Sequence, residues 1–381
     1  MRNIWRPRLN PPESGFFQTL KTKRPVKISR TSYWLDRLEL TRPYAIAYES
    51  IDAVDNIFVR IEAENGEFGM GVAAPAEEVT GESVQDCLKA LCDHLEETLR
   101  GGDLRHFHSL LSKLENEMGG QPAARAAVDM ALHDLWAKHL GLPLADWLGR
   151  VHKRLPTSIT IGIKGIEESL EEAEEYRRRG FCILKVKTGI SLEEDIERLV
   201  RIRERVGSGF KIRVDANQGY SAAEFKRFMF ETGDLDLEFV EQPLKARNLA
   251  SMRRLPEGMR RASAADESLL HAGDAIACLA RPRPFGIFNI KLMKCGGIRE
   301  GMRIAEIARL SGIDLMWGCM DESVIGISAA LHAALSSPAT RYLDLDGSLD
   351  LARDPATGGF ELEAGWLTVT DRPGLGVSPV A

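Results

Sequence analysis

The sequence has no excess of positive charge and no hydrophobic run long enough to cross a membrane. Its 381 residues include 50 lysines and arginines against 56 aspartates and glutamates, which gives a formal net charge of -6. Proteins that bind nucleic acid through its phosphates need a basic surface, and a membrane span needs about 20 consecutive apolar residues. We therefore expect neither nucleic acid nor membrane as a partner, and a small molecule or peptide instead.

Cysteine is scarce and scattered. The six cysteines include no CxxC pair and follow no regular spacing. Disulfide frameworks and zinc sites both depend on closely spaced cysteines, so we predict free thiols, a cytoplasmic location and no zinc.

The first 25 residues contain many basic residues and prolines but no continuous apolar core. A secretory signal needs such a core before its cleavage site. We interpret residues 1–25 as an N-terminal extension that precedes the folded part of the chain.

A strand followed by an amphipathic helix recurs from Pro156 onward. The helices are clear in segments such as "SLEEDIERLVRIRERV", where apolar residues recur at helical spacing among charges. Eight such units, roughly 25 residues apart, predict a (β/α)₈ barrel over residues 151–346. The candidate strands begin near Thr157, Phe181, Lys211, Leu237, Ala262, Gly286, Ile313 and Thr340.

The segments on either side of the barrel have a different pattern. "DNIFVRIEAENGEFGMGVAA" predicts an antiparallel hairpin that turns at Asn65 and Gly66, and "AARAAVDMALHDLWAKHLGLPLADWL" predicts a long helix that ends at Gly141. Residues 26–150 are thus expected to form an α+β capping domain. Residues 347–381 return to strands and turns and are expected to pack back on it. The predicted fold class is α/β, a modified TIM barrel with a capping domain completed by the C-terminal tail.

Carboxylates end three successive candidate strands, at Asp215, Glu241 and Asp266. The carboxyl ends of parallel barrel strands share one rim, so these side chains should meet there. Three oxygen ligands without sulfur or imidazole suit Mg²⁺, and we expect one ion per subunit. The alternative is that each carboxylate caps the following helix, which explains one of them more readily than all three.

Two lysines share one face of the strand in "FCILKVKTG", because Lys185 and Lys187 are two residues apart. On this stretch alone they could simply extend to solvent. However, Lys187 and Lys291 end the strands on either side of the three carboxylates. A lysine near a divalent cation and another lysine should favour its neutral form and could act as a base near neutral pH. Two bases on opposite sides of one carbon predict racemisation or epimerisation.

Five motifs resemble the enolase superfamily, in its muconate-lactonizing subgroup. The resemblance implies that Asp215, Glu241 and Asp266 bind the metal, that Lys187 and Lys291 are the acid and base, and that Lys185 supports the site electrostatically. The motifs are "LKVK" at 184–187, "DANQG" at 215–219, "EQP" at 241–243, "ADES" at 265–268 and "NIKLMKCGG" at 289–297.

The motif "DLD", with Asp344 and Asp346 at the last strand, resembles the dipeptide epimerases of this subgroup, which include L-Ala-D/L-Glu epimerases. The resemblance implies that both aspartates hold the α-ammonium group of a dipeptide. The alternatives are an o-succinylbenzoate synthase or an N-succinylamino acid racemase, whose substrates carry no ammonium to pair with them. A capped loop with solvated aspartates is the purely structural alternative.

Two further acidic residues bear on the substrate. Glu49 stands where Ala-Glu epimerases resemble each other in a basic residue, and Asp321 follows the seventh strand. Together they would repel a glutamate side chain and attract lysine or arginine, unless Glu49 is solvated or Asp321 is paired with an arginine.

We therefore expect an isomerase: a Mg²⁺-dependent, homo-oligomeric dipeptide epimerase. It would invert the α-carbon of the C-terminal residue of an L,L-dipeptide through a metal-stabilised enediolate, with a basic or otherwise non-acidic residue preferred there. A barrel that binds metal without catalysis is the alternative from another class. The intact metal and base positions argue against it.

Overall fold

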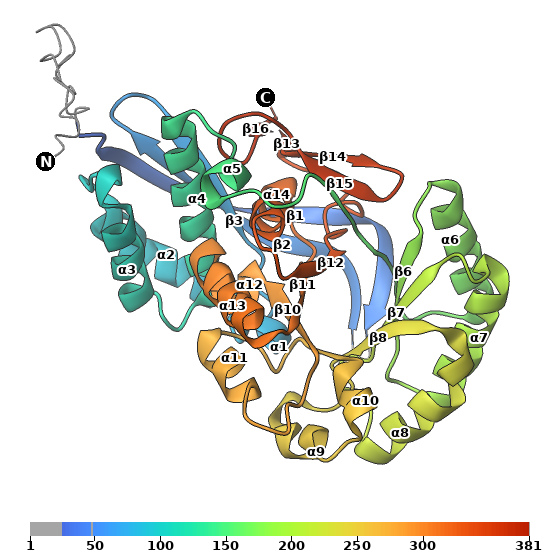
Figure 1. Ribbon diagram of the computed structural model, residues 1–381. Helices are drawn as coiled ribbons and strands as arrows, with labels where there is room; N and C mark the ends of the chain where they lie inside the picture. Colours follow the sequence, from blue (N-terminus) through green and yellow to red (C-terminus); the bar gives the residue numbers. More distant parts are fainter. Residues whose placement is uncertain (1–24, 47–48, 381) are drawn as a thin grey trace, which may run out of the picture.

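The computed structural model describes residues 25–46 and 49–380, and the side chains of residues 43–46 and 49–50 lie outside this description. The predicted extension, residues 1–25, lies outside it except for Pro25. Figure 1 shows a barrel ringed by helices and, beside it, an antiparallel sheet with its own helices.

Eight parallel strands form the barrel sheet, in the order β12-β11-β10-β9-β8-β7-β6-β5. A parallel bridge between Thr157 and Leu343 joins its two ends. Every strand begins within two residues of its predicted start, so the predicted barrel is confirmed. The strands are β5 (Ile159–Ile161), β6 (Ile183–Lys187), β7 (Lys211–Asp215), β8 (Leu237–Glu241), β9 (Ser263–Ala265), β10 (Ile287–Lys291), β11 (Asp314–Gly318) and β12 (Thr340–Asp344).

The barrel helices alternate with these strands. Most are amphipathic and bury one face, whereas α14 is buried almost all round because it lies between the barrel, strand β3 (Phe68–Ala73) and the C-terminal tail. The helices are α6 (Ile166–Arg178), α7 (Leu192–Val206), α8 (Ala222–Glu231), α9 (Leu249–Arg253), α10 (Glu257–Arg261), α11 (Ala272–Cys278), α12 (Leu292–Cys295), α13 (Ile298–Ser311) and α14 (Val324–Leu335).

The N-terminal region contains the predicted hairpin and helices. Gly66, at φ +85°, turns the chain between β2 and β3, and Asn65 Oδ1 accepts a hydrogen bond from Glu67 N at 3.2 Å. Helix α4 lies directly on β3. The contact is so close that a Cβ atom on Gly71 would be 1.8 Å from the carbonyl oxygen of Ala127. The elements are β1 (Ile28–Ile46), β2 (Glu49–Ala63), β3 (Phe68–Ala73), α1 (Glu77–Thr80), α2 (Val84–Leu99), α3 (Phe107–Glu117), α4 (Pro122–Leu140) and α5 (Leu144–Leu148).

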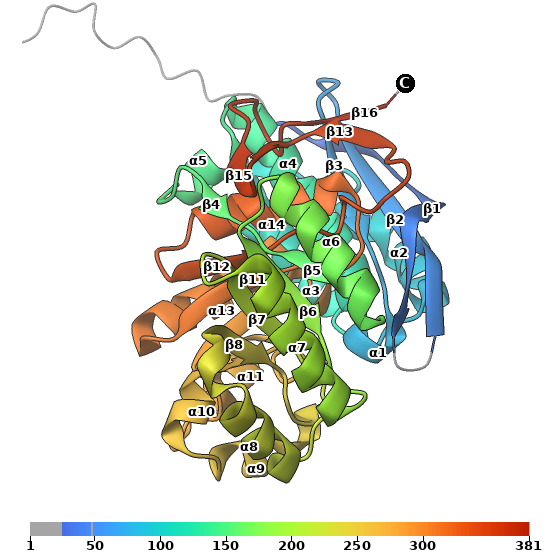
Figure 2. The same cartoon turned by 90° about the vertical axis from the view of Figure 1, so that its right-hand side faces the viewer.

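The C-terminal tail contacts both regions (Figure 2). Strand β15 pairs with β4 at the entry to the barrel, and the backbone N–H of Leu375 donates to Asp134 in α4 at 2.8 Å. The predicted division at residues 25, 150 and 346 stays a prediction. The short strands are β4 (Leu155–Pro156), β13 (Ala356–Gly358), β14 (Phe360–Glu363), β15 (Trp366–Val369) and β16 (Val377–Pro379).

All six cysteines lie within the described residues, and none forms a disulfide. In the same part of the chain, no helix has both the length and the apolar character needed to cross a bilayer.

Candidate active site

A cavity of about 600 Å³ opens at the carboxyl ends of the barrel strands, where they face β2. Its wall includes Lys185 and Lys187 from β6 and Lys291 from β10, two strands that are four positions apart in the sheet. Both aspartates of the "DLD" motif also line it. A second hollow of about 760 Å³ lies beside α6 and contains none of the predicted site residues. The chemistry of the walls, rather than their volume, therefore locates the candidate site.

The three predicted metal ligands lie on neighbouring strands. Asp215 pairs in register with Glu241, and Glu241 pairs with Ala264, two residues before Asp266. All three side chains are buried. Burial, together with the charge of Asp215, raises the pKa of Glu241 to about 8. The buried carboxylates therefore repel one another, and this repulsion favours the protonated form of Glu241.

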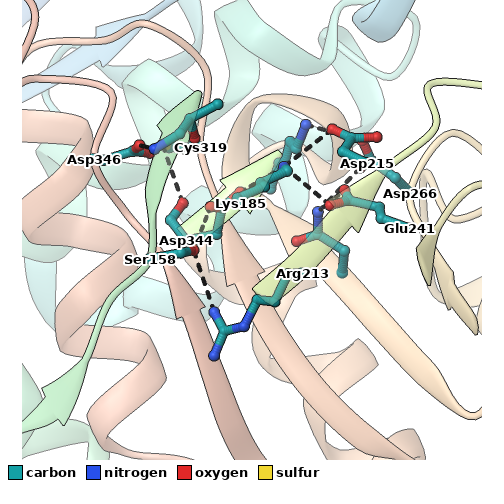
Figure 3. A network of polar contacts seen from close by, with 12 residues as sticks. Ser158, Lys185, Arg213, Asp215, Glu241, Asp266, Cys319, Asp344 and Asp346 are labelled. Carbon is teal, nitrogen blue, oxygen red and sulfur yellow. Dashed lines mark hydrogen bonds and ion pairs between the residues drawn. The ribbon is translucent and has the colours of Figure 1, made fainter. Parts of the chain in front are cut away.

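The Lys185 ammonium group lies among these carboxylates, as Figure 3 shows. Its Nζ atom is 3.1 Å from Asp215 Oδ2, 2.9 Å from Glu241 Oε2 and 2.7 Å from Asp344 Oδ2. Burial alone would lower the pKa of Lys185, but the charges of Asp215, Asp344 and Glu241 outweigh burial and raise it. Lys185 is therefore a fixed cation and does not extend to solvent.

Lys291 lies on the far side of the carboxylates. Its Nζ atom is 2.9 Å from Asp266 Oδ2, and the Lys294 ammonium donates to Asp266 Oδ1. Burial would lower the pKa of Lys291, but the charge of Asp266 raises it. The carboxylate in contact with Lys291 thus favours the charged form of this lysine, and the neutral form predicted beside a divalent cation stays a prediction.

Lys187 ends β6 and pairs in register with Asp215. It lines the cavity opposite Lys291, since β6 and β10 are separated by the three strands that carry the carboxylates. The two predicted bases therefore flank the predicted metal ligands.

Sequence reasoning missed two neighbours of these groups. Asn289 Nδ2 donates to Glu241 Oε1 at 2.6 Å, and Lys294 Nζ also donates to the backbone oxygen of Asp266 at 2.7 Å. The signal for Asn289 was present, because it stands two residues before Lys291 on the same strand and so shares its face. Nothing in the sequence pattern marked Lys294 as buried.

The two aspartates of "DLD" have different partners. Asp344 accepts from the Ser158 hydroxyl at 2.7 Å and from Lys185 at 2.7 Å, so both its oxygens are engaged. Asp346 accepts from the backbone N–H of Thr160 at 2.7 Å and lines the cavity. Burial and then the charge of Asp344 raise the pKa of Asp346 to about 7. Both aspartates line the cavity, and Asp346 Oδ1 also accepts from the Cys319 thiol at 4.0 Å.

Further acidic side chains line the outer part of the cavity. Asp321 follows β11, and its backbone oxygen accepts from Asn56 Nδ2 at 3.2 Å. Burial and then the charge of Asp321 raise the pKa of Asp350, another wall residue. Glu49 begins β2 and pairs with Ile46 through the backbone, but its side chain lies outside the described residues.

Within residues 25–46 and 49–380, no group of three or more histidine, cysteine, aspartate or glutamate side chains is arranged to hold a metal ion directly. The ammonium groups of Lys185, Lys291 and Lys294 contact the carboxylates instead. The donor set still fits a hard divalent cation. The set consists of carboxylate oxygens alone, and the raised pKa of Glu241 indicates that a further positive charge would stabilise the ionised carboxylates.

The chain matches two sequence families over most of its length. Residues 19–149 match the mandelate racemase / muconate lactonizing enzyme N-terminal domain, and residues 168–380 match the enolase C-terminal domain-like family.

Curated relatives and solved structures are similar over nearly the whole chain. The L-Lys-D/L-Arg epimerase of Desulforapulum autotrophicum is 58% identical, over 93% of this chain and 100% of that protein. A dipeptide epimerase from Methylococcus capsulatus, solved with Mg and the dipeptide L-Arg-D-Lys, is 52% identical with a TM-score of 0.90, over 92% of this chain and 99% of that one. A substrate-liganded L-Ala-D/L-Glu epimerase from Bacillus subtilis is 34% identical with a TM-score of 0.89, over 93% and 99%.

Proposed function

The chain belongs to the enolase superfamily, in the mandelate racemase/muconate lactonizing enzyme family, and from this premise we propose that it is a Mg²⁺-dependent dipeptide epimerase. The reaction inverts the α-carbon of the C-terminal residue of an L,L-dipeptide. One observation carries the proposal: Lys187 and Lys291 flank the buried carboxylates, and Asp346 lines the same cavity.

The two lysines perform the proton transfer. With the α-carbon between them, one lysine as the neutral amine removes the proton from one face, and the other as the ammonium gives a proton to the opposite face, so the configuration inverts. Asp266, in contact with Lys291, holds that lysine in place. A dipeptide that keeps its α-carbon at this point extends its amino end toward β12.

The difficulty of the reaction is the weak acidity of a proton beside a carboxylate. Mg²⁺, held by Asp215, Glu241 and Asp266, would supply positive charge beside the substrate carboxylate and make the α-proton more acidic. Lys185 adds a fixed cation on the same side of the cavity, because Asp215, Glu241 and Asp344 hold it charged. Its role is electrostatic support.

The substrate amine is recognised at the other end of the cavity. The Asp346 carboxylate can accept a hydrogen bond from an α-ammonium group, and Asp344 sets the local negative charge beside it. This favours a dipeptide over an N-succinylated amino acid or a succinylbenzoate precursor, which carry no cation at that position.

The preferred side chains are cationic. Asp321 and Asp350 line the outer cavity, and they would attract a lysine or arginine side chain and repel glutamate. The similarity to the L-Lys-D/L-Arg epimerase of Desulforapulum autotrophicum supports the same preference. Glu49 is proposed to add to it.

The test is incubation with a dipeptide library in deuterated water and Mg²⁺, read by mass and by chiral separation. We expect deuterium at the C-terminal α-carbon together with inversion, fastest for dipeptides such as L-Arg-L-Lys. Exchange into N-succinyl-arginine but into no dipeptide would replace the proposal with the racemase alternative. Dehydration of a succinylated cyclohexene acid would replace it with the synthase.

A further inference from the structure

The guanidinium group of Arg198, on α7, is buried beneath the rim of the cavity. The residue is 3% exposed, although it belongs to a helix whose charged residues mostly face solvent. Arg198 donates to the backbone oxygen of Lys187, and at 3.3 Å to those of Gly162 and Lys164. One side chain thus binds the ends of both β5 and β6, including the carbonyl of a predicted base.

Asp195 holds this arginine and extends the contact to the next strand. Its Oδ1 atom is 3.3 Å from Arg198, and its Oδ2 atom accepts from Gly189 N at 2.7 Å and from the Tyr220 hydroxyl at 2.9 Å. Gly189 and Tyr220 follow β6 and β7. The pair therefore ties together the backbone on both sides of Lys187 and the loop after the predicted ligand Asp215.

The loops after β6 and β7 also lie in direct contact. A Cβ atom on Gly219 would be 2.2 Å from the backbone oxygen of Gly189, so only glycine fits there. Burying a charged pair costs several kcal/mol unless its hydrogen bonds are satisfied, and a well-packed apolar pair would stabilise the barrel at least as well. The position of this pair behind Lys187 therefore calls for a reason other than stability.

We propose that Arg198, oriented by Asp195, is a positioning residue for Lys187. Lysine has a long side chain with four rotatable bonds, so its ammonium group is placed accurately only if its backbone is fixed. Arg198 fixes that backbone through the Lys187 carbonyl, on the side of the strand away from the substrate. The inference rests on the proposed function, in which Lys187 serves one face of the α-carbon and Lys291 serves the other.

The rate of epimerisation cannot distinguish the two lysines, because the equilibrium constant fixes the ratio of kcat/KM in the two directions. Exchange of the α-proton for deuterium without inversion can distinguish the two lysines. A lysine that removes a proton can return a deuteron from solvent to the same face, so the exchange rate of each epimer reports on one lysine. Lys187→Ala identifies the epimer that depends on Lys187.

The experiment compares initial deuterium exchange into L-Arg-L-Lys and L-Arg-D-Lys for Arg198→Gln, Arg198→Lys and Tyr220→Phe. Arg203→Gln is the matched control. Arg203 is on the same helix and also donates to backbone oxygens, those of Leu235, Gly207 and Phe210, but at the end of α7 away from the cavity.

We expect Arg198→Gln to lower exchange of the Lys187-dependent epimer roughly 10- to 100-fold, with little change in KM or in exchange of the other epimer. Arg198→Lys should recover part of the loss, and Tyr220→Phe should cause a smaller loss for the same epimer. Arg203→Gln should lower the melting temperature and leave both exchange rates unchanged. If Arg198→Gln does not fold, Arg198→Lys and Tyr220→Phe carry the test.

Equal losses for both epimers, or a rise in KM alone, would overturn the positioning role while leaving the proposed function intact. If the wild-type protein exchanges neither epimer, the proposed function fails, and the inference fails with it.

Discussion

Lys185 and Asp344 form a buried ion pair, with Nζ 2.7 Å from Oδ2, that joins the two ends of the candidate active site. On one side Lys185 contacts Asp215 and Glu241, and on the other Asp344 lies two residues before Asp346 in sequence. A change of charge at either end of the site therefore changes the electrostatic potential at the other end. The two aspartates of the motif therefore have different partners, which the motif alone does not reveal.

Asparagine substitutions should distinguish Asp344 from Asp346. Asp344→Asn removes a charged partner of Lys185 and should lower stability by about 1–3 kcal/mol. Asp346→Asn should cost little stability, because burial already raises the pKa of this carboxyl, but should raise KM for dipeptides with a free amine. Melting curves and steady-state kinetics check both. Equal effects on KM, with no difference in stability, would contradict separate roles.

Removing the ammonium group of Lys291 should greatly slow turnover and spare the fold. Lys291→Ala leaves Asp266 with Lys294 as a cationic partner, so the carboxylate does not become unpaired. We expect kcat to fall roughly 10²- to 10⁴-fold, measured by inversion of L-Arg-L-Lys. Lys211→Ala is the control, since this exposed lysine begins β7 at the opposite end of the strand. An unchanged rate in Lys291→Ala would remove Lys291 from the mechanism.

The stability of the protein in EDTA should fall as pH rises from about 5 to about 8. Burial raises the pKa of Glu241 and of Glu322 to about 8, and that of Asp346 to about 7, from ordinary values of 4.5 and 3.8. The folded state therefore binds more protons than the unfolded state in this window, and each group contributes up to about 1.4 kcal/mol of lost stability per pH unit. Urea unfolding at several pH values measures the slope.

Added Mg²⁺ should raise the melting temperature more at pH 8.5 than at pH 6. The ligands must be ionised to bind the cation, and protonation of Glu241 below its pKa of about 8 opposes binding. Thermal melts at fixed Mg²⁺ concentration, with Ca²⁺ for comparison, measure the shift. A stabilisation independent of pH would indicate that Glu241 is not a ligand.

Neutralising Asp321 should weaken the preference for cationic dipeptides. Asp321→Asn keeps the shape of the side chain and the backbone contact with Asn56 but removes the charge. We expect kcat/KM for L-Arg-L-Lys to fall about tenfold, which corresponds to about 1.4 kcal/mol. The value for an apolar dipeptide such as L-Leu-L-Tyr should stay the same. Equal losses for both substrates would indicate a structural role for Asp321.

The barrel and the placement of its carboxylates could be predicted because they depend on periodicity. Asp215, Glu241 and Asp266 each end a strand, and parallel register brings strand ends together whatever the loops do. The contact of 2.9 Å between Lys291 and Asp266, which raises the pKa of this lysine, could not be predicted, because strand order does not reveal it.

The supporting residues could not be predicted for a different reason. Arg198 lies in a helix rich in charge, and hydrophobic periodicity gives no sign of which arginine turns inward. Ser158 and Asp344 are 186 residues apart, and their hydrogen bond exists only where the barrel closes. Such pairings depend on side-chain packing in three dimensions.

The bridge between Thr157 and Leu343 closes the barrel where the proposed amine-binding aspartates lie. Ser158 and Thr160 belong to the start of the barrel, while Asp344 and Asp346, which they hold, belong to its end. A chain that ends before β12 has the three carboxylates and both lysines but lacks Asp344 and Asp346. Under the proposed function, affinity for the amino end of a peptide is therefore expected only once β12 has joined the barrel.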